Sequence, residues 1–350
     1  MRFARYDDDR YGVVVGDKVH DITDAVAKTL SGKKKQRWGD PMIANLAEVR
    51  AAVGDGSKFP SKALSSVTLL SPTANPSKLI AAPTNYHAHV AEMRARNPNA
   101  GPGKGIKESG LFLKANSAMC GPGEGVHIRF LDRLTEHELE FMIVIGKEGS
   151  QIPEAKALDY VAGYCLSLDM TVRGGEERSL RKSIDSYAVI GPWLVTKDEI
   201  KDPNDVPFKL FCNGQLRHNA HTNDLIYNCQ KLIALASDFY TLYPGDVIFT
   251  GAPAGVGPVK PGDVMTAECA AIGPMGVKSF ARSKGSLGYR LTFTAFAEIT
   301  IASVEPSADC QWAVTAHSRW RFAGQTSLQS QARTARRSGR MRKARPFSAT

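Results

Sequence analysis

The sequence predicts a mainly β fold with peripheral helices, and two observations lead to this prediction. From residue 76 to about residue 285, short apolar runs of strand length follow one another and are separated by Gly, Pro and Asn residues. Helical patterns are too few to alternate with these runs, which argues against an open Rossmann sheet built from βαβ units. We therefore expect one large domain at 76–285, preceded by a small N-terminal domain at 1–75.

The N-terminal region is predicted to contain short strands and a helix and to end in a Pro- and Ser-rich segment. Strand-like patterns cover "RYGVVVGDKVHDI", a short helix is expected around "PMIANLAEVRAAV", and the region closes with the Pro- and Ser-rich "LSPTANPSK". In the larger domain the strand-like runs are "KLIAAP", "GLFLKAN", "LEFMIVIG", "VAGYCLSLDM", "GPWLVT", "FKLFCNG" and "GDVIFTG". Asn213 and Gly214 fit a tight hairpin turn that leads into "QLRHNAHT".

Composition limits the class of protein. The chain has 350 residues, of which 43% are hydrophobic and 23% charged, as is usual for a globular protein. No apolar run approaches the roughly 18 residues that a membrane span needs, and the start "MRFARYDDDRYG" lacks the apolar segment of a signal peptide. We therefore expect a cytoplasmic protein with no membrane span. The six cysteines show no CxxC pairing, which predicts reduced thiols, no disulfide and no zinc site.

The net charge of +10 is concentrated near the C-terminus. From Arg282 onward there are twelve Lys or Arg residues and three acidic residues, so residues 1–281 are nearly neutral. We expect the basic extension at 286–350 to be largely disordered, because it cannot bury enough apolar surface to offset the entropy of ordering it. A basic arm that binds nucleic acid is one interpretation. An extension read through from a shifted frame is more economical, so nucleic-acid binding is not favoured.

The stretch "LTEHELEFMIVIGKEG" places Glu138 and Glu140 at the start of the most apolar run in the chain. Alternate side chains of a strand share a face, so the two carboxylates would lie roughly 6 to 7 Å apart on one side. A second run delivers Asp169 near its end, and three converging carboxylates would need a hard divalent cation, Mg²⁺ or Mn²⁺. Spacing alone favours a plainer interpretation, in which the Glu residues face solvent on an edge strand and Asp169 caps a turn.

A histidine and a carboxylate stand three residues apart in "APTNYHAHVAEMRARNP". His89 and Glu92 would share one face of a short helix and could touch. A carboxylate in contact with an imidazole orients the ring and makes it a general base. Taken alone, such a pair is more often part of a solvated helix face.

Other polar features are given structural interpretations. Lys114 and Arg129 are interpreted as surface charges. His218 and His221 follow the expected hairpin in a polar strand, where an exposed or hydrogen-bonded role is favoured over a metal pair. The glycine-rich "GAPAGVG" lacks a following helix and a Lys-Ser/Thr pair, so it is interpreted as a turn lining the pocket and not as a phosphate loop.

Together these stretches resemble the fumarylacetoacetate hydrolase family, most closely its small acylpyruvase and oxaloacetate decarboxylase branch. The resemblance extends over residues 79 to about 277 and rests on many motifs in family order. They are "NYHAHVAEM", "FLKANSAMCGPG", "HELEFMIVIGK", "ALDYVAGYCLSLDMTVR", "KSIDSYAVIGPWLVT", "CNG" and "LYPGDVIFTGAPAGVGPVKPGD".

The resemblance implies a mixed β-roll, usually dimeric, and a set of site residues. The implied metal ligands are Glu138, Glu140 and Asp169, the implied water-activating dyad on a lid is His89 with Glu92, and Lys182 would lie beside the substrate. The implied substrate-binding residues are Arg173, Gly251 and Ala252. This chain departs from the family where many members read Arg-Asp and then Gln, since it has Arg173, Gly174, Gly175 and Glu176. It also has "TGAP" for the usual "TGTP", so the identity of the substrate stays open.

The activity that the resemblance implies is hydrolysis of a carbon–carbon bond in a 2,4-dioxo acid, such as an acylpyruvate or a fumarylacetoacetate-like compound. The expected partners are a small 2-oxo acid and a second copy of the chain in a homodimer. One alternative is a decarboxylase or isomerase of 2-oxo-heptenedioate-type intermediates in aromatic-compound catabolism. Another is a non-catalytic binding protein that uses the basic extension. The presence of every implied metal, dyad and lysine position favours an enzyme.

Overall fold

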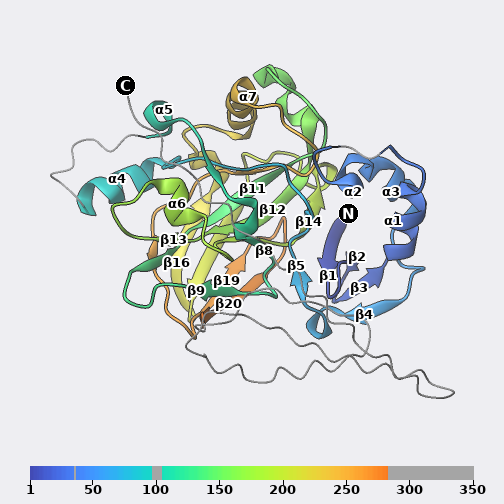
Figure 1. Cartoon of the computed structure of the whole chain (residues 1–350), viewed down its shortest axis with the longest axis horizontal. Coiled ribbons are helices and arrows are strands. Elements are labelled where there is room, and N and C mark those ends of the chain that lie inside the picture. The colour runs from blue at the N-terminus through green and yellow to red at the C-terminus, as the bar shows by residue number, and fades with distance from the viewer. Residues whose placement is uncertain (35–36, 97–104, 283–350) are drawn as a thin grey trace, which may run out of the picture. The chain divides into compact units, whose positions relative to one another are not determined.

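The computed structural model describes residues 1–34, 37–96 and 105–282, and it shows a mainly β protein with a few helices (Figure 1). The extension predicted at 286–350 lies outside the described residues. Among the described helices, none is long and apolar enough to cross a membrane.

The largest sheet has 12 strands, and its main path runs β4-β3-β2-β1-β14-β12-β11-β17-β6-β7, with β5 paired to β1 and β8 to β14. Its strands are β1 (Arg2–Tyr6), β2 (Arg10–Val15), β3 (Lys18–Asp21), β4 (Ser61–Ala63), β5 (Leu69–Leu70), β6 (Leu79–Ala81), β7 (Phe112–Lys114), β8 (Met119–Cys120), β11 (Leu139–Ile145), β12 (Val161–Asp169), β14 (Ala188–Thr196) and β17 (Val247–Phe249). The pairings are mostly antiparallel, but β6 with β17 and β8 with β14 are parallel, so the sheet is mixed.

Two smaller sheets complete the β structure. A five-stranded sheet has the order β16-β15-β19-β20-β9, and a three-stranded sheet has the order β13-β10-β18. Their strands are β9 (Val126–Ile128), β10 (Thr135–His137), β13 (Thr171–Val172), β15 (Pro207–Cys212), β16 (Gln215–His221), β18 (Gly257–Pro258), β19 (Val264–Glu268) and β20 (Met275–Ala281). The hairpin expected between β15 and β16 is confirmed, because Asn213 and Gly214 have φ values of 51° and 76°, as a tight turn of this kind requires.

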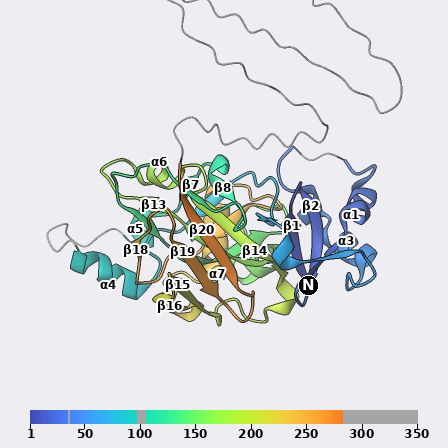
Figure 2. The same ribbon diagram turned by 90° about the horizontal axis from the view of Figure 1, so that it is seen from below.

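The helices are short. They are α1 (Thr23–Leu30), α2 (Pro41–Ala44), α3 (Leu46–Val53), α4 (His87–Arg96), α5 (Ile106–Ser109), α6 (Arg178–Lys182) and α7 (Cys229–Phe239), with 3₁₀ turns η1 (Leu64–Ser66), η3 (Asn116–Ala118), η4 (Glu154–Tyr160), η5 (Lys197–Glu199) and η6 (Thr222–Asp224). In Figures 1 and 2, α1 and α3 lie beside β1 and β2, whereas α4 and α6 lie at the other side of the sheets.

The single helix expected around residues 41–53 is instead two helices. Asp40 accepts hydrogen bonds from the backbone N–H groups of Met42 and Ile43, which begins α2. Asn45 then leaves helical geometry at φ −114° and ψ 25°, and its side-chain amide donates to the carbonyl of Pro41 at 2.8 Å. A polar side chain that binds its own backbone thus ends the helix after one turn.

The two faces of the large sheet are both buried, which explains the continuous apolar runs of the sequence. In β11 the side chains of Phe141 and Ile143 join a core shared with the five-stranded sheet and α7, while Met142 and Val144 join a core that α1 and α3 cover. Successive residues of a strand point to opposite faces, so a strand covered on both faces is apolar at consecutive positions, as β11 is from Phe141 to Ile145.

Helix α7 is an element that the sequence interpretation missed. Its buried apolar residues are Cys229, Leu232, Ile233 and Ala236, a spacing typical of one apolar helix face. Asn228 caps the helix by accepting a hydrogen bond from the Lys231 N–H at 2.9 Å. The helix packs against η4 and covers the large sheet on the side of Phe141.

The N-terminal strands extend the large sheet. Strand β1 pairs antiparallel with β14, with Arg2 opposite Val195 and Phe3 opposite Leu194. Residues 1–75 therefore share hydrogen bonds and an apolar core with the rest of the described chain. The domain boundary at residues 75 and 76 stays a prediction.

Candidate active site

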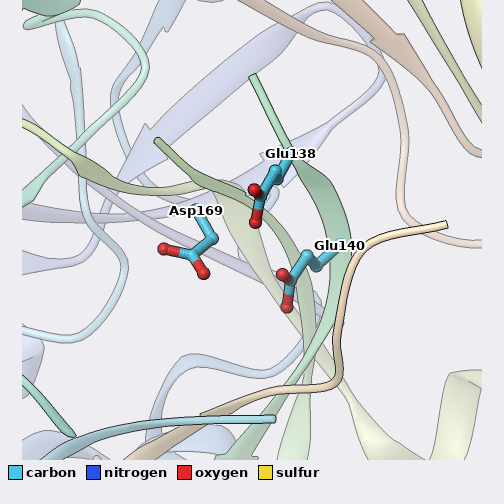
Figure 3. Close-up of side chains that lie close together, drawn as sticks. All are labelled: Glu138, Glu140 and Asp169. Atoms are coloured by element: carbon cyan, nitrogen blue, oxygen red, sulfur yellow. The ribbon is translucent and has the colours of Figure 1, made fainter. Parts of the chain in front are cut away.

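Three acidic side chains converge where the large sheet meets the three-stranded sheet. Glu138 lies between β10 and β11, Glu140 is the second residue of β11, and Asp169 ends β12. The backbone N–H of Asp169 donates to the Glu138 carbonyl at 2.8 Å, which sets the register of the two strands at this point. One carboxylate oxygen from each of the three side chains lies within 4.8 Å of the others, and Figure 3 shows the three groups around one small space.

All three carboxylates are buried. Glu138 is 6%, Glu140 1% and Asp169 2% exposed. The plainer interpretation, with solvent-facing glutamates on an edge strand, is therefore wrong. Strand β11 is flanked by β12 and β17 and has no free edge, and Glu138 and Glu140 share the face of Met142, as the period of two residues predicts.

Two buried lysines partly neutralise the acidic cluster. The Lys182 ammonium, at the end of α6, donates to Glu138 Oε2 at 2.5 Å and to Asp169 Oδ2 at 2.7 Å. The Lys114 ammonium, from β7, donates to Asp169 Oδ1 and to the Tyr187 carbonyl. The interpretation of Lys114 as a surface charge is wrong, since the residue is 3% exposed. Arg129, by contrast, is a surface charge, with its side chain 49% exposed.

The pKa values in this cluster respond to burial and to the neighbouring charges. Burial alone would raise the pKa of Glu138, but Lys182 and Arg173 outweigh it and lower the pKa to about 2. Glu140 has no such direct lysine contact, so burial and the nearby Asp169 raise its pKa well above the usual range. Burial lowers the pKa of Lys114, although Asp169 opposes the shift.

The donor set fits a hard divalent cation. Three carboxylates face two lysine ammonium groups, which leaves the cluster one negative charge in excess when all are ionised. Carboxylate oxygens without Cys or His ligands are the set that Mg²⁺ and Mn²⁺ prefer.

Arg173 lies at the rim of the cluster. Its guanidinium donates to Glu136 and, at 3.4 Å, to Glu138 Oε1, and its side chain is 29% exposed. Arg133 holds the Arg173 backbone carbonyl at 2.9 Å and binds both carboxylate oxygens of Glu176. A Cβ at Gly174 would lie 2.0 Å from the Arg133 guanidinium, so a larger residue there would require the Arg133 and Glu176 side chains to shift.

The expected dyad is present on α4. The Nδ1 atom of His89 lies 3.0 Å from Glu92 Oε2, and the imidazole side chain is 8% exposed. The solvated helix face is therefore wrong for His89. The Gly255 N–H donates to both Glu92 carboxylate oxygens at 3.3 Å, so the dyad touches the loop at 251–256. His89 is also close enough to the acidic cluster to stabilise the charge of Glu138.

The same loop contacts the acidic cluster. The Gly251 N–H donates to Glu140 Oε2 at 2.7 Å, and the following Ala252 is buried. Gly251 has φ of 103°, and a Cβ there would lie 2.7 Å from the Cβ of Asn85, so glycine is required on both grounds. Asn85 donates to the Thr250 carbonyl at 2.8 Å and thereby fixes the start of the loop.

The structure thus brings together the residues that the sequence singled out. Lys114 was missed, although its apolar neighbours in "GLFLKAN" are a signal that it is buried. His137 and His218 form a buried pair behind the loop, which the spacing of the two residues in the sequence could not reveal.

Comparison with known proteins identifies the family. The model for the C-terminal domain of fumarylacetoacetate (FAA) hydrolase matches residues 78–278. A maleylpyruvate hydrolase from Aquipseudomonas alcaligenes is 50% identical over 283 residues, which cover 79% of this chain and 98% of the relative. A mitochondrial oxaloacetate tautomerase from Xenopus laevis is 37% identical over 222 residues, covering 60% of this chain and 67% of the relative.

Solved structures give the same result. The maleylpyruvate hydrolase from Sphingobium sp. SYK-6, in complex with manganese(II) and pyruvate, superposes with a TM-score of 0.69 at 35% identity, covering 81% of this chain and 100% of that one. A 5-carboxymethyl-2-hydroxymuconate delta-isomerase from Mycobacterium smegmatis has a TM-score of 0.60 at 28% identity, with the same coverage. This protein therefore belongs to the fumarylacetoacetate hydrolase family.

Proposed function

We propose that this protein is a divalent-metal-dependent hydrolase that cleaves a carbon–carbon bond in a 2,4-dioxo acid, with maleylpyruvate as the first candidate substrate. The observation that carries the proposal is the buried cluster of three carboxylates beside a His–Glu dyad. The choice of substrate is supported by the 50% identity to a maleylpyruvate hydrolase.

Glu138, Glu140 and Asp169 would hold the cation. Manganese in the related Sphingobium structure supports Mn²⁺, and the all-oxygen donor set equally suits Mg²⁺. When bound, the cation supplies Lewis acidity toward the 2-oxo acid end of the substrate. Arg173 would bind a substrate carboxylate, which is supported by its partly exposed guanidinium at the rim of the cluster.

The His89–Glu92 dyad would accept a proton from the attacking water. His89 Nδ1–H donates to Glu92, which leaves Nε2 as the ring nitrogen that accepts a proton from water. The water oxygen adds to the distal carbonyl carbon, the bond from that carbon to the methylene breaks, and its electron pair forms the enolate of pyruvate. Lys182 offsets negative charge in this region. Protonation of the enolate carbon then gives pyruvate, and the other product from maleylpyruvate is maleate.

A second candidate activity uses the same enolate. Without attack by water, stabilisation of an enolate supports keto–enol isomerisation or decarboxylation of a 2-oxo acid. The similarity to an oxaloacetate tautomerase and to a delta-isomerase favours this alternative over a non-catalytic binding protein. The His89–Glu92 pair suits the hydrolase, which needs a base for the attacking water, and the 50% identity to a maleylpyruvate hydrolase favours hydrolysis over isomerisation.

The test is a substrate panel measured with Mn²⁺, with Mg²⁺ and with a chelator. The panel contains maleylpyruvate, acetylpyruvate, oxaloacetate and a 2-oxo-heptenedioate, and both pyruvate release and keto–enol exchange are recorded. We expect metal-dependent release of pyruvate and maleate in equal amounts. Exchange or CO₂ release without cleavage of any dioxo acid would identify the isomerase or decarboxylase instead.

A cytoplasmic homodimer belongs to the same proposal. It is supported by the resemblance to dimeric family members and by a composition typical of globular proteins. Light scattering coupled to gel filtration gives the mass in solution, and a mass near twice the 37.9 kDa of one chain is expected.

A further inference from the structure

Two histidines form a buried pair behind the loop that carries Gly251 and Gly255. His137 ends β10 and His218 lies in β16, and both are 0% exposed. The Nδ1 atom of His137 lies 3.2 Å from Nε2 of His218, and Nδ1 of His218 lies 2.9 Å from the Ala254 carbonyl oxygen. The pair therefore connects two sheets with the backbone of the loop.

The Ala254 carbonyl determines which ring nitrogens of the two histidines carry a proton. A carbonyl oxygen only accepts, so His218 Nδ1 must carry a proton and donate it. Burial favours the neutral imidazole, which leaves His218 Nε2 as an acceptor for the Nδ1–H of His137. The remaining nitrogen, His137 Nε2, has no hydrogen-bond partner in the described chain. The Nδ1–H of His137 thus donates to His218, and the Nδ1–H of His218 donates to the loop carbonyl of Ala254.

The loop is held on either side of Ala254 as well. His137 pairs with Gly257 across strands β10 and β18. Gly255 has φ of 98°, and a Cβ there would lie 1.9 Å from the Arg217 carbonyl oxygen, so the loop lies directly against β16. The peptide unit that receives the His218 hydrogen bond is the one that joins Ala254 to Gly255. Its carbonyl binds His218, and its N–H binds Glu92.

We propose that His218, backed by His137, is a positioning residue that orients the peptide between Ala254 and Gly255 so that its N–H holds Glu92 in register with His89. The inference deepens the proposed function, on which its catalytic part rests. Both contacts of the Gly255 N–H to Glu92 are 3.3 Å long, so a rotation of this peptide would lengthen or lose them.

The test compares two substitutions of one residue. His218→Leu removes the donor to Ala254, whereas His218→Asn places a side-chain amide N–H near the position of Nδ1 and keeps it. His221→Leu, three residues along the same strand, is the matched control, because His221 contacts Asp205 and the Asn223 N–H and not the loop. Each variant is assayed for kcat, KM, Mn²⁺ affinity and amide hydrogen exchange.

We expect His218→Leu to lower kcat by about 10- to 100-fold, the cost of a misplaced catalytic group, with KM and Mn²⁺ affinity nearly unchanged. His218→Asn should recover most of the loss, and His221→Leu should behave as wild type. Exchange of the Gly255 amide should quicken by about tenfold in His218→Leu alone, because its hydrogen bond to Glu92 is weakened.

Two results would overturn the inference. One is an unchanged kcat in His218→Leu at a temperature where the variant is folded, and the other is equal losses in the Asn and Leu variants with no change in exchange at Gly255. A wild-type protein that is inactive on every 2,4-dioxo acid would instead overturn the proposed function. In that case the exchange rate of the Gly255 amide still decides whether His218 positions the loop.

Discussion

The acidic cluster and the dyad differ in how the fold holds them. Glu140 and Asp169 belong to β11 and β12 inside the large sheet, and Lys182 and Lys114 bind the cluster at close range. The dyad lies on the short α4, which Figures 1 and 2 show at the edge of the molecule's described part. The side chain of Glu92 is 20% exposed, against 2% for Asp169. The three carboxylates are thus fixed by strand register, whereas the position of the His89–Glu92 pair depends on one helix and one loop.

The largest effect is expected from removing one charge of the cluster. Glu140→Gln keeps the hydrogen bond from Gly251 but removes the negative charge of a proposed metal ligand, so pyruvate release should fall by roughly a thousandfold or more. The rise in melting temperature on adding Mn²⁺ should also shrink, since a ligand stabilises the state that binds it. Calorimetry with and without Mn²⁺ measures the second effect. Glu268→Gln, on the exposed face of β19, is the control, and an unaltered Mn²⁺ response in Glu140→Gln would exclude Glu140 as a ligand.

A substitution in the His89–Glu92 dyad should slow the chemical step without changing the affinity for the metal. His89→Ala should lower kcat by about a hundred- to ten-thousandfold, the usual contribution of a general base, while Mn²⁺ affinity stays near that of wild type. His87→Ala, on the exposed side of the same helix, should leave both unchanged. Hydrolysis at the wild-type rate without His89 would make this side chain an ordinary part of α4.

A substitution of Lys114 tests how far the stability of the protein depends on the lysine ammonium groups that contact the acidic cluster. Lys114→Met removes one of the two ammonium groups on Asp169, and breaking a buried ion pair costs about 3 to 5 kcal/mol. The metal-free variant should therefore be destabilised in urea by about that amount, and Mn²⁺ should stabilise it more than it stabilises wild type. Lys278→Met, exposed on β20, serves as the comparison. Equal urea midpoints for the two metal-free variants would contradict the ionic role of Lys114.

The smallest effect at neutral pH concerns His218. Burial lowers its pKa from the ordinary value of 6.5 to about 4, so between these values the unfolded chain binds the proton and the folded chain does not. The contribution to stability is complete above pH 6.5 and is lost as the pH falls toward 4, by up to about 3 kcal/mol. Urea unfolding from pH 7.5 to 4.5 should show a shallower decline in His218→Asn than in wild type. Parallel curves would rule out titration of His218 as a cause.

Strand patterns predicted the part of the site that depends on neighbours in sequence. The spacing of Glu138 and Glu140 already required a shared face, and the position of Asp169 at the end of an apolar run brought it to the same edge. The roles of these residues came from the resemblance to a family and not from the spacing, which by itself favoured exposure. The fold class followed in the same way from the many short apolar runs.

The remaining contacts of the site could not be predicted, because they depend on pairing between strands that are far apart in the sequence. Lys114 contacts Asp169 only because β6 joins β7 to β17, and β17 joins β11, an order that no local pattern contains. His137 and His218 are 81 residues apart and meet because β10 pairs with β18, which follows the loop at 251–256, while β16 lies against that loop. Helix α7 was missed since its apolar stripe is short and sits among many strand-like runs.

The two buried faces of β11 have a consequence for how this gene can vary. Inserting or deleting one residue between Glu138 and the end of the strand would exchange the sides to which alternate residues point. An insertion directly after Glu138 would bring Leu139 to the position of Glu140 and a deletion there would bring Phe141, and in both cases Glu140 would enter the apolar core beneath the five-stranded sheet. We therefore expect a change of length here to disrupt folding and activity together, whereas substitutions can separate the two. Among related chains, this strand should vary in amino-acid identity but not in length.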